Sequence, residues 1–251
     1  MIKLTDTHRY YKGLPHQVRA IEQLQKLIEE RYPEILENQE WITTWRSESN
    51  PDPQLQSQWI PAVAIALINA VPNDVVPNGK TRRENATTAI PLLLRACDKY
   101  AVRDPAHIAY IMGTVSHESY FAPIKEIGSD AYFTRMYEWR TILGNTQPGD
   151  GAKYAGRGYV QITGRRNYAL FEKLLGIPLV TEPDLALVPQ FAAEICVRGM
   201  AEGLFTGRKM GDFGAGDTFQ WKQARQVING MDRADLIAGY ARHYYQAILS
   251  V

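Results

Sequence analysis

The chain has 251 residues, enough for one large domain or for a domain of about 150 residues with an appendage. Hydrophobic residues make up 45% and charged residues 22%, which is typical of a globular protein and excludes a disordered or fibrous chain. The 28 basic and 27 acidic residues give a net charge of +1 without a basic run, so a nucleic-acid partner is not expected.

The chain shows no sign of a membrane or secretory segment. Its longest apolar stretch, residues 59–71, is shorter than the roughly 20 residues that cross a bilayer, so no membrane span is expected. The first eight residues lack the apolar core of a signal peptide. We therefore expect synthesis in the cytoplasm without a signal peptide, and an extracellular target would be reached after release or delivery by another route.

Cysteine and histidine spacing indicates no metal site. Cys97 and Cys196 lie within apolar helical patterns, which favours two buried reduced thiols, with a single disulfide as the alternative. His117 and Glu118 resemble the start of a zinc-binding helix motif, but Phe121 and Ala122 stand where its second histidine would fall. No metal or other cofactor is implied.

Two helices are expected before residue 80. Apolar residues recur at helical spacing over residues 14–38, and a second apolar helix covers about 58–71. The following residues, 72–80, are rich in Pro, Asn and Gly and predict a turn. We take this turn as the boundary between a short helical N-terminal segment, residues 1–80, and a domain of residues 81–251.

Beyond the turn, the sequence predicts a mainly α-helical domain. The pair Asp104-Pro105 combines an N-cap carboxylate with proline at the first helical position, and this helix is expected to end near Tyr120. Residues 141–165 are rich in Gly, Thr and Asn and predict a long loop with an extended piece at 159–162. Further helices are expected from an Asn85 cap to Val102, over 166–175 and 187–204, from an Asp217 cap to Ile228, and after an Asp232 cap, with a core stripe of Ile237, Tyr240, Ala241, Tyr244 and Ile248.

Two glutamates near the end of the 105–120 helix are the first candidates for chemistry. Glu118 lies in its last turn, and Glu126 follows eight residues later, beyond Pro123, which lets the chain turn back toward the helix. Glycoside hydrolysis needs such a pair: one protonated carboxyl donates to the leaving oxygen, and one ionised carboxylate activates water or attacks the sugar. Two glutamates at a helix end are more often solvated or ion-paired, so this pattern alone leaves both interpretations open.

Residues 154–168, here called the signature segment, add a second signal. The segment combines several glycines with polar and aromatic side chains, and glycines let a backbone approach a ligand closely. In an extended strand, Gln161 and Thr163 would point to the same side, into a groove. A tight hairpin with incidental polar residues is the alternative; it explains the glycines but not the whole string.

The signature segment resembles the G-R-G-x-x-Q-[IL]-[ST]-G-x-x-N-Y motif of family 19 glycoside hydrolases, which include chitinases and bacteriophage endolysins. It matches every fixed position from Gly156 to Tyr168. The resemblance covers about residues 86–251, and residues 143–151 are similar to a loop of the endolysin-type branch. Residues 116–119 resemble the family's S-H-E-[ST] segment, and residues 226–230 resemble its I-I-N-G-G segment.

The resemblance implies a lysozyme-like, two-lobed helical domain with a small β-hairpin region. It also implies cleavage of β-1,4 bonds next to N-acetylated sugars by an inverting acid/base mechanism. Glu118 would be the acid, and Glu126 the base that holds the attacking water with help from Thr163. Gln161 and Asn229 would hold sugar hydroxyl and acetamido groups. Further candidates for substrate contact are His117, Tyr154, Arg157, Asn167 and Tyr168.

Glu138 is a rival for the base. We favour Glu126, which falls where short-loop members of the family carry this residue, and we expect Glu138 to pair with Arg140 or another nearby arginine.

Chitin and peptidoglycan share a β-1,4-linked N-acetylhexosamine backbone, so the glutamate pair does not distinguish them. The endolysin-type loop, the absence of a signal peptide and a total of two cysteines, too few for the disulfides of plant members, favour peptidoglycan. A chitinase acting on chitin oligomers and a non-catalytic glycan-binding module with the same fold are the alternatives.

The role of residues 1–80 has two interpretations. A helical extension could pack on the hydrolase domain or dock to a phage particle or an injection-type assembly. Residues 18–27 also faintly resemble the V-x-x-L-Q-x-x-L helix of small peptidoglycan-binding domains, which suggests wall binding instead.

Overall fold

The structure is a computed structural model that describes residues 25, 26, 28–30, 37 and 59–251. The chain divides into two compact units, Met1–Ala62 and Val63–Val251. Of the helix expected over 14–38, residues 25, 26 and 28–30 are described and are helical, and residue 37 is described as part of a turn; the rest lies outside the described residues. The boundary expected near residue 80 lies inside the second unit, and the role of residues 1–80 stays a prediction.

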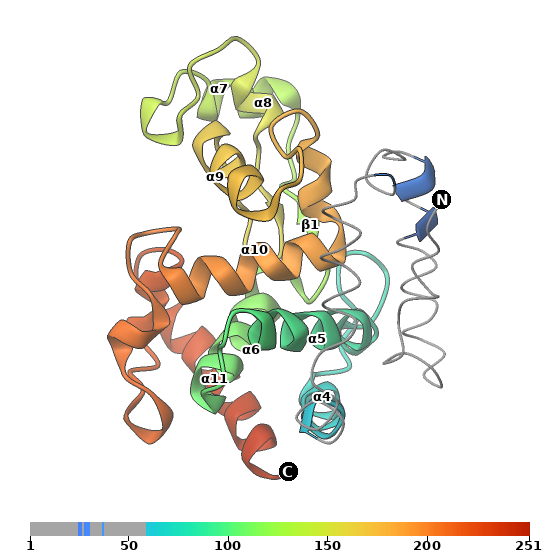
Figure 1. Cartoon of the computed structure of the whole chain (residues 1–251), viewed down its shortest axis with the longest axis vertical. Coiled ribbons are helices and arrows are strands. Elements are labelled where there is room, and N and C mark those ends of the chain that lie inside the picture. Colours follow the sequence, from blue (N-terminus) through green and yellow to red (C-terminus); the bar gives the residue numbers. More distant parts are fainter. Residues whose placement is uncertain (1–24, 27, 31–36, 38–58) are drawn as a thin grey trace. The chain divides into compact units, whose positions relative to one another are not determined.

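Residues 59–251 are mainly helical, as expected (Figure 1). A two-stranded sheet and several short 3₁₀ turns connect the helices. In chain order the helices and strands are α4 (Trp59–Ala70), α5 (Arg82–Lys99), α6 (Pro105–Ser119), β1 (Ile124–Lys125), α7 (Asp130–Tyr137), α8 (Asp150–Lys153), β2 (Arg157–Gly158), α9 (Arg165–Leu175), α10 (Pro189–Glu202) and α11 (Ala234–Leu249).

Within the second unit, the helices form two lobes. In the core lobe, α6 packs along α11 and α5 packs against α10, while α7, α8 and α9 gather at the other end (Figure 1). The contact of α6 with α11 is close because Gly113 has no side chain: a Cβ there would lie 2.8 Å from the backbone nitrogen of Ala241. The apolar residues of α6 that recur at helical spacing are all buried: Ile108, Ile111, Met112 and Val115.

The start of α6 is as the sequence predicts. Asp104 accepts hydrogen bonds from the amides of Ala106 (2.9 Å) and His107 (3.1 Å), and Pro105 occupies the first helical position. The same carboxylate accepts the amide of Gly216 at 3.0 Å, which ties the helix start to a distant loop.

Two expected caps, Asn85 and Asp217, are wrong. Thr81 caps α5, in a capping box with Glu84, because its hydroxyl reaches the amide three residues on; Asn85 lies inside the helix. Asp217 lies in the 3₁₀ turn Gly216–Thr218, where it accepts the Tyr245 hydroxyl. No helix runs from there to Ile228, since the chain forms only the 3₁₀ turn Gln223–Val227 (η8).

The last helix, α11, begins at Ala234 without a side-chain cap. The expected cap, Asp232, is wrong as well, because Arg233 adopts a left-handed conformation (φ 58°) and the Asp232 carbonyl accepts Arg225 Nε. The apolar stripe on α11 is confirmed. Ile237, Ala241, Tyr244 and Ile248 are buried, and Tyr240 is half-buried.

The extended piece expected over 159–162 is wrong for residues 159–161, which form a turn, whereas Ile162 is part of a β-bridge. Gly158 (φ 88°) and Gln161 (φ 56°) both take left-handed conformations, which reverse the chain so that Arg157 pairs with Ile162. The extended residues come just before, in β2, which pairs antiparallel with β1: Ile124 lies opposite Gly158, and Lys125 opposite Arg157.

Both cysteines are buried free thiols, as the sequence favours. Burial raises the pKa of the Cys97 and Cys196 thiols, which keeps them protonated and unreactive. Among the residues that the structure describes, no helix is both long and apolar enough to cross a membrane.

We expect Asp104→Ala to lower the free energy of unfolding by about 1–2 kcal/mol, because it leaves the first amides of α6 and the Gly216 amide without their acceptor. Urea denaturation followed by circular dichroism measures this loss. Asp104→Asn, which keeps a side-chain oxygen, should lose clearly less. An equal loss in both variants would show that the capping hydrogen bonds are not the cause.

Candidate active site

Glu118 lies in the last turn of α6, where the helix is abruptly terminated. Tyr120 (φ 53°) and Phe121 (φ 60°) both take left-handed conformations, so the chain leaves the helix in a new direction. The carboxylate of Glu118 forms an ion pair with Arg225 of η8, with 2.6 Å between Oε1 and Nη1. Arg225 is only 4% exposed, but the Glu118 side chain is 22% exposed, so the pairing leaves part of the Glu118 side chain accessible.

Two hydroxyl groups lie on the same face of α6 as Glu118. Tyr110 and Thr114 precede Glu118 by two turns and one turn, at a spacing of four residues, which places the three side chains in one row. Both hydroxyls are buried and, within the described residues, have no hydrogen-bond partner. Burial raises the pKa of Tyr110, which the charges of Arg225 and Glu118 also influence. A protonated phenol therefore lies close to the ion pair.

His117 is partly buried beside Tyr240, with 6.4 Å between the ring centroids. Burial lowers the pKa of His117, so its imidazole is neutral at pH 7. A neutral ring is able both to donate and to accept a hydrogen bond.

Glu126 directly follows β1 and is held at three points. Its backbone amide donates to the Gly156 carbonyl (2.8 Å), which extends the β1–β2 pairing by one residue. Its Oε1 accepts the Tyr137 hydroxyl (2.7 Å), and its Oε2 accepts the Gly156 amide (3.1 Å). The side chain stays partly exposed, so a carboxylate with a fixed position remains open to solvent.

Gln161 lies close to this carboxylate, but a turn rather than a strand brings it there, and Thr163 is bound to the backbone of Gln161. The Gln161 side-chain amide donates to the carbonyls of Ile124 (2.7 Å) and Gly158 (2.9 Å), and Thr163 Oγ1 donates to the Gln161 carbonyl (3.0 Å). A Cβ at Gly156 would lie 2.9 Å from Gln161 Oε1 and 3.1 Å from Glu126 Oε2. Gln161 and Glu126 therefore meet at Gly156.

Two expected substrate contacts are instead interior groups, and a third, Arg157, is almost fully buried and reaches the surface at the pocket described below. Tyr154 and Tyr168 have no exposed surface, and their hydroxyls donate to the carbonyls of Val180 and Ala155. Arg157 is 4% exposed. These side chains support the signature segment from inside, because buried polar groups need internal partners.

Asn167 and Asn229 are more exposed than Tyr154 and Tyr168. Asn167 is half-buried and donates to the Thr163 carbonyl (2.9 Å), which steadies the turn. Asn229 is exposed, and its Oδ1 accepts the amide of the next residue, Gly230 (2.8 Å).

The carboxylate of Glu138 binds backbone amides at the start of α8. Its two carboxylate oxygens accept the amides of Gly149 and Gly151, each at 2.7 Å. These amides belong to a helix start, which needs acceptors. The expected pairing of Glu138 with an arginine is therefore wrong, and both oxygens of this rival base have a structural use.

Sequence reasoning missed Arg225, Tyr137 and Gly156 as partners of the two glutamates. One signal in the sequence could have identified Arg225 as a buried charge. It lies between the apolar residues Ala224 and Val227, directly before the family-like segment 226–230. Tyr137 carried no such signal, because only the folded chain brings α7 to the end of β1.

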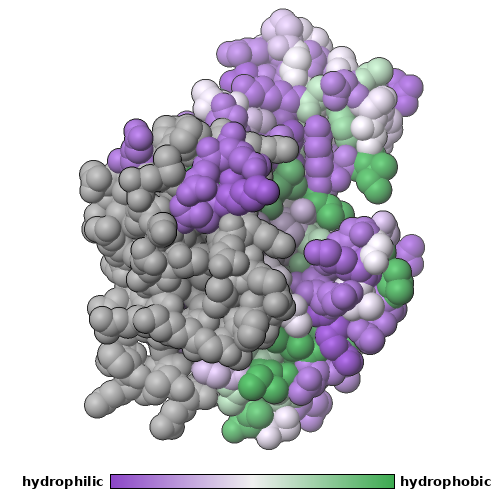
Figure 2. All heavy atoms as spheres, turned by 90° about the vertical axis from the view of Figure 1, so that its right-hand side faces the viewer, coloured by the Kyte–Doolittle hydropathy of each residue, from purple (hydrophilic) through white to green (hydrophobic). Residues whose placement is uncertain are grey.

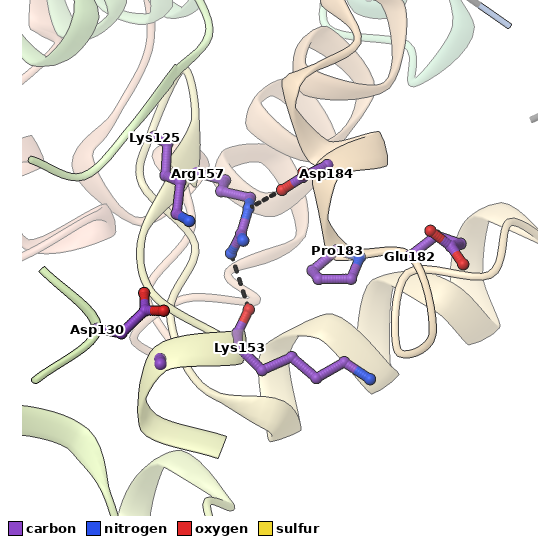
Figure 3. Close-up of a pocket in the computed structure, with 8 residues that line it drawn as sticks. Lys125, Asp130, Lys153, Arg157, Glu182, Pro183 and Asp184 are labelled. Carbon is purple, nitrogen blue, oxygen red and sulfur yellow. Dashed lines mark hydrogen bonds and ion pairs between the residues drawn. The ribbon is translucent and has the colours of Figure 1, made fainter. Parts of the chain in front are cut away.

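The surface is hollowed between the lobes. Figure 2 shows a recess in the described part, between an upper and a lower group of side chains, at the height that separates the two lobes in Figure 1. A separate pocket of about 260 Å³ is lined by Lys125, Lys153 and Arg157, among others (Figure 3). Since neighbouring side chains of a strand point to opposite faces, this pocket lies on the other face of β1 from Glu126.

Within the described part of the chain, no group of three or more His, Cys, Asp or Glu side chains is placed to hold a metal ion.

Comparisons with known proteins support the resemblance to family 19. No protein-family model matches the chain. A curated protein of Haemophilus influenzae, described as a glycosyl hydrolase family 19 domain-containing protein, is 55% identical over 42 residues. This match covers 17% of the chain and only 21% of the relative, so the chain is similar to about a fifth of that protein.

Two solved structures share the fold. A mutant of chitinase C has a TM-score of 0.52 and 20% identity, over 77% of this chain and 94% of that chain. Chitinase C from Streptomyces griseus HUT6037 has a TM-score of 0.51 and 18% identity, over 76% and 77% of the two chains. The lysozyme-like helical fold expected from the sequence is thus confirmed. The endolysin-type branch stays a prediction.

Tyr137→Phe removes the phenol that donates to Glu126 and leaves the ring in place. If Glu126 takes part in glycan cleavage, we expect a loss of about tenfold in kcat, since one oriented hydrogen bond contributes about 1–1.5 kcal/mol. The assay measures release of reducing ends from glycan strands. Tyr132→Phe, a neighbouring change on α7, is the control, and an equal loss in both variants would contradict the role of Tyr137.

Proposed function

We propose that this protein is a glycoside hydrolase that cleaves β-1,4 bonds next to N-acetylated amino sugars in peptidoglycan, with inversion. One observation carries the proposal: two partly exposed carboxylates, Glu118 and Glu126, are each fixed by their own partners on either side of the left-handed turn at residues 120–121. The short curated match to a family 19 protein and the fold of chitinase C support it.

In this mechanism the two glutamates have different tasks. Glu118, a carboxylate in its ion pair with Arg225, takes up a proton from solvent and then gives it to the glycosidic oxygen as the bond to the anomeric carbon breaks. Ionised Glu126 takes a proton from a water molecule that attacks the same carbon from the opposite face of the ring. The products are two shorter glycans, one carrying the new hydroxyl in inverted configuration, and proton exchange with solvent restores both carboxyl groups.

The surroundings of Glu126 suit a base. Tyr137 and the Gly156 amide donate to different oxygens of its carboxylate, so both oxygens have a fixed position. Burial and the contact with Glu126 raise the pKa of Tyr137 to about 12, so this phenol keeps its proton and its donor role throughout the neutral range.

Three polar side chains are proposed to bind the attacking water or the sugar: Thr163, Gln161 and Asn229. Thr163 helps to hold the attacking water, and Asn229 is an exposed amide for an acetamido group. The Gln161 amide nitrogen is occupied by two carbonyls, so its Oε1, beside Gly156, is the atom that would accept a sugar hydroxyl. His117 is a further candidate for a contact near the acid.

We favour peptidoglycan as the substrate because of the endolysin-type loop at residues 143–151 and the low number of cysteines. The protein would then act on the wall after release or delivery from the cytoplasm. A chitinase is the second candidate, which the fold of chitinase C favours. A non-catalytic glycan-binding module is less consistent with a pair of carboxylates positioned so firmly.

Removal of either carboxylate tests the assignment of roles. We expect Glu118→Gln and Glu126→Gln to lower kcat on purified sacculi by about 10²–10⁴, because each removes a proton-transfer group. Glu138→Gln is the control: it loses an acceptor for the α8 amides but no chemical group, so its specific activity in folded protein should remain close to that of the wild type. Full activity of Glu118→Gln would refute the proposed acid.

The stereochemistry of the first product tests the role of Glu126 independently. A base that activates water yields the α-anomer from a β-linked glycan, whereas a nucleophilic carboxylate yields the β-anomer. Proton NMR of fresh products from soluble glycan strands or chitin oligomers distinguishes the two before mutarotation. A β-anomer as the first product would contradict the inverting mechanism.

A further inference from the structure

The pocket on the far face of β1, here called the cross-strand pocket, brings together charges that the proposed mechanism does not use. It is lined by Lys125, Asp130, Lys153, Arg157, Glu182 and Asp184, together with Ala152 and Pro183 (Figure 3). Its charged side chains balance, with both signs present. Such a lining does not suit a polyanion, but it suits a ligand that carries both a carboxylate and an ammonium group.

Two cations lie directly opposite each other across the β1–β2 ladder. Lys125 is the register partner of Arg157, so both side chains lie on the same face, where like charges directly opposite are destabilising. Asp184 compensates Arg157 through its Nε (2.7 Å). The Lys125 ammonium makes no ion pair or hydrogen bond with any residue in the described part of the chain. An anion between the two strands would relieve this repulsion.

Arg157 has one nitrogen left for such an anion. Its Nε is bound by Asp184, and its Nη1 donates to the carbonyls of Lys153 and Ala155 and to the Tyr168 hydroxyl. These bonds fix a guanidinium that is 4% exposed, so that ordering it costs little when a ligand binds. Nη2 makes no hydrogen bond within the described residues, and Figure 3 shows the guanidinium between Lys125 and Pro183.

We propose that the cross-strand pocket binds the stem peptide of peptidoglycan, with a peptide carboxylate held between Lys125 Nζ and Arg157 Nη2. This inference rests on the proposed function and names its substrate class, because chitin carries no peptide. The exposed carboxylates of Asp130 and Glu182 on the same pocket would face the ammonium group of the peptide.

The pocket lies within reach of a glycan bound at the proposed catalytic site. Lys125 directly precedes Glu126, and neighbouring residues of a strand are about 3.3 Å apart. An extended peptide spans about 3.3 Å per residue, so four residues cover about 13 Å. A peptide attached to a sugar near Glu126 is therefore long enough to pass the strand and enter the pocket.

Calorimetric titration with a soluble stem tetrapeptide tests the pocket without turnover. We expect Lys125→Met to weaken binding about tenfold, since it removes one charge-assisted hydrogen bond from an exposed residue that the fold does not need. Lys173→Met, which removes the same charge from α9 in the same lobe, should bind as the wild type does. When its carboxylates are amidated, the tetrapeptide should bind the wild type and Lys173→Met as weakly as the free acid binds Lys125→Met.

Any of three results would overturn the proposal. The wild type and Lys125→Met could bind the tetrapeptide equally well, or Lys173→Met could lose as much affinity as Lys125→Met. The wild type could also bind the amidated tetrapeptide as tightly as the free acid. A measurement of enzyme activity provides a second test of the pocket. The ratio of turnover on intact sacculi to turnover on the same glycan stripped of peptide should fall in Lys125→Met. Full activity of Glu118→Gln would instead overturn the proposed function and leave the peptide titration interpretable.

Discussion

The geometry of the site depends on the way Gly156 holds Glu126. The carbonyl of Gly156 accepts the Glu126 amide, and the amide of Gly156 donates to the Glu126 carboxylate. One residue of the signature segment therefore fixes both the backbone and the side chain of the proposed base. A Cβ there would come within 2.9 Å of Gln161 Oε1 and 3.1 Å of Glu126 Oε2, so a larger residue would displace these two side chains. The same pairing, continued one residue back, places Lys125 opposite Arg157 and so forms the cross-strand pocket.

The acid is fixed by different means. Glu118 belongs to a helix whose start is tied down by Asp104 and whose length is buried in the core lobe. Arg225 reaches it from a 3₁₀ turn and is itself buried, so its position is fixed by packing. The proposed base therefore depends on strand pairing and the proposed acid on helix packing. Two independent supports of this kind allow the separation of the carboxyl groups to stay constant, as the proposed inverting mechanism would require.

The sequence predicted the features that depend on local chemistry. Asp104 and Pro105 give the start of α6, and the apolar stripe gives the buried face of α11, because caps and periodicity act over a few residues. Local signals failed where several residues compete for one role: Thr81 rather than Asn85 caps α5. Segments shaped by tertiary contacts, such as η8, gave no periodic signal at all.

Among the expected site residues, the structure separates those that face the surface from those that support it. Glu118, Glu126 and Thr163 are partly exposed, whereas Tyr154 and Tyr168 are interior. The motif that suggests a binding site thus contains packing residues as well, because a glycine-rich turn needs a rigid support. Arg225 and Tyr137 escaped sequence reasoning because each meets its glutamate only through the fold.

A crystal structure of the Glu118→Gln variant with an N-acetylglucosamine oligomer tests the central claim most directly. The account predicts that the oligomer lies between the lobes, with a glycosidic oxygen beside residue 118 and a water between Glu126 and the anomeric carbon. The two carboxyl positions should be about 6.5–9.5 Å apart across the sugar. An oligomer bound elsewhere, or a sugar ring with Glu126 and the acid on the same face, would contradict it.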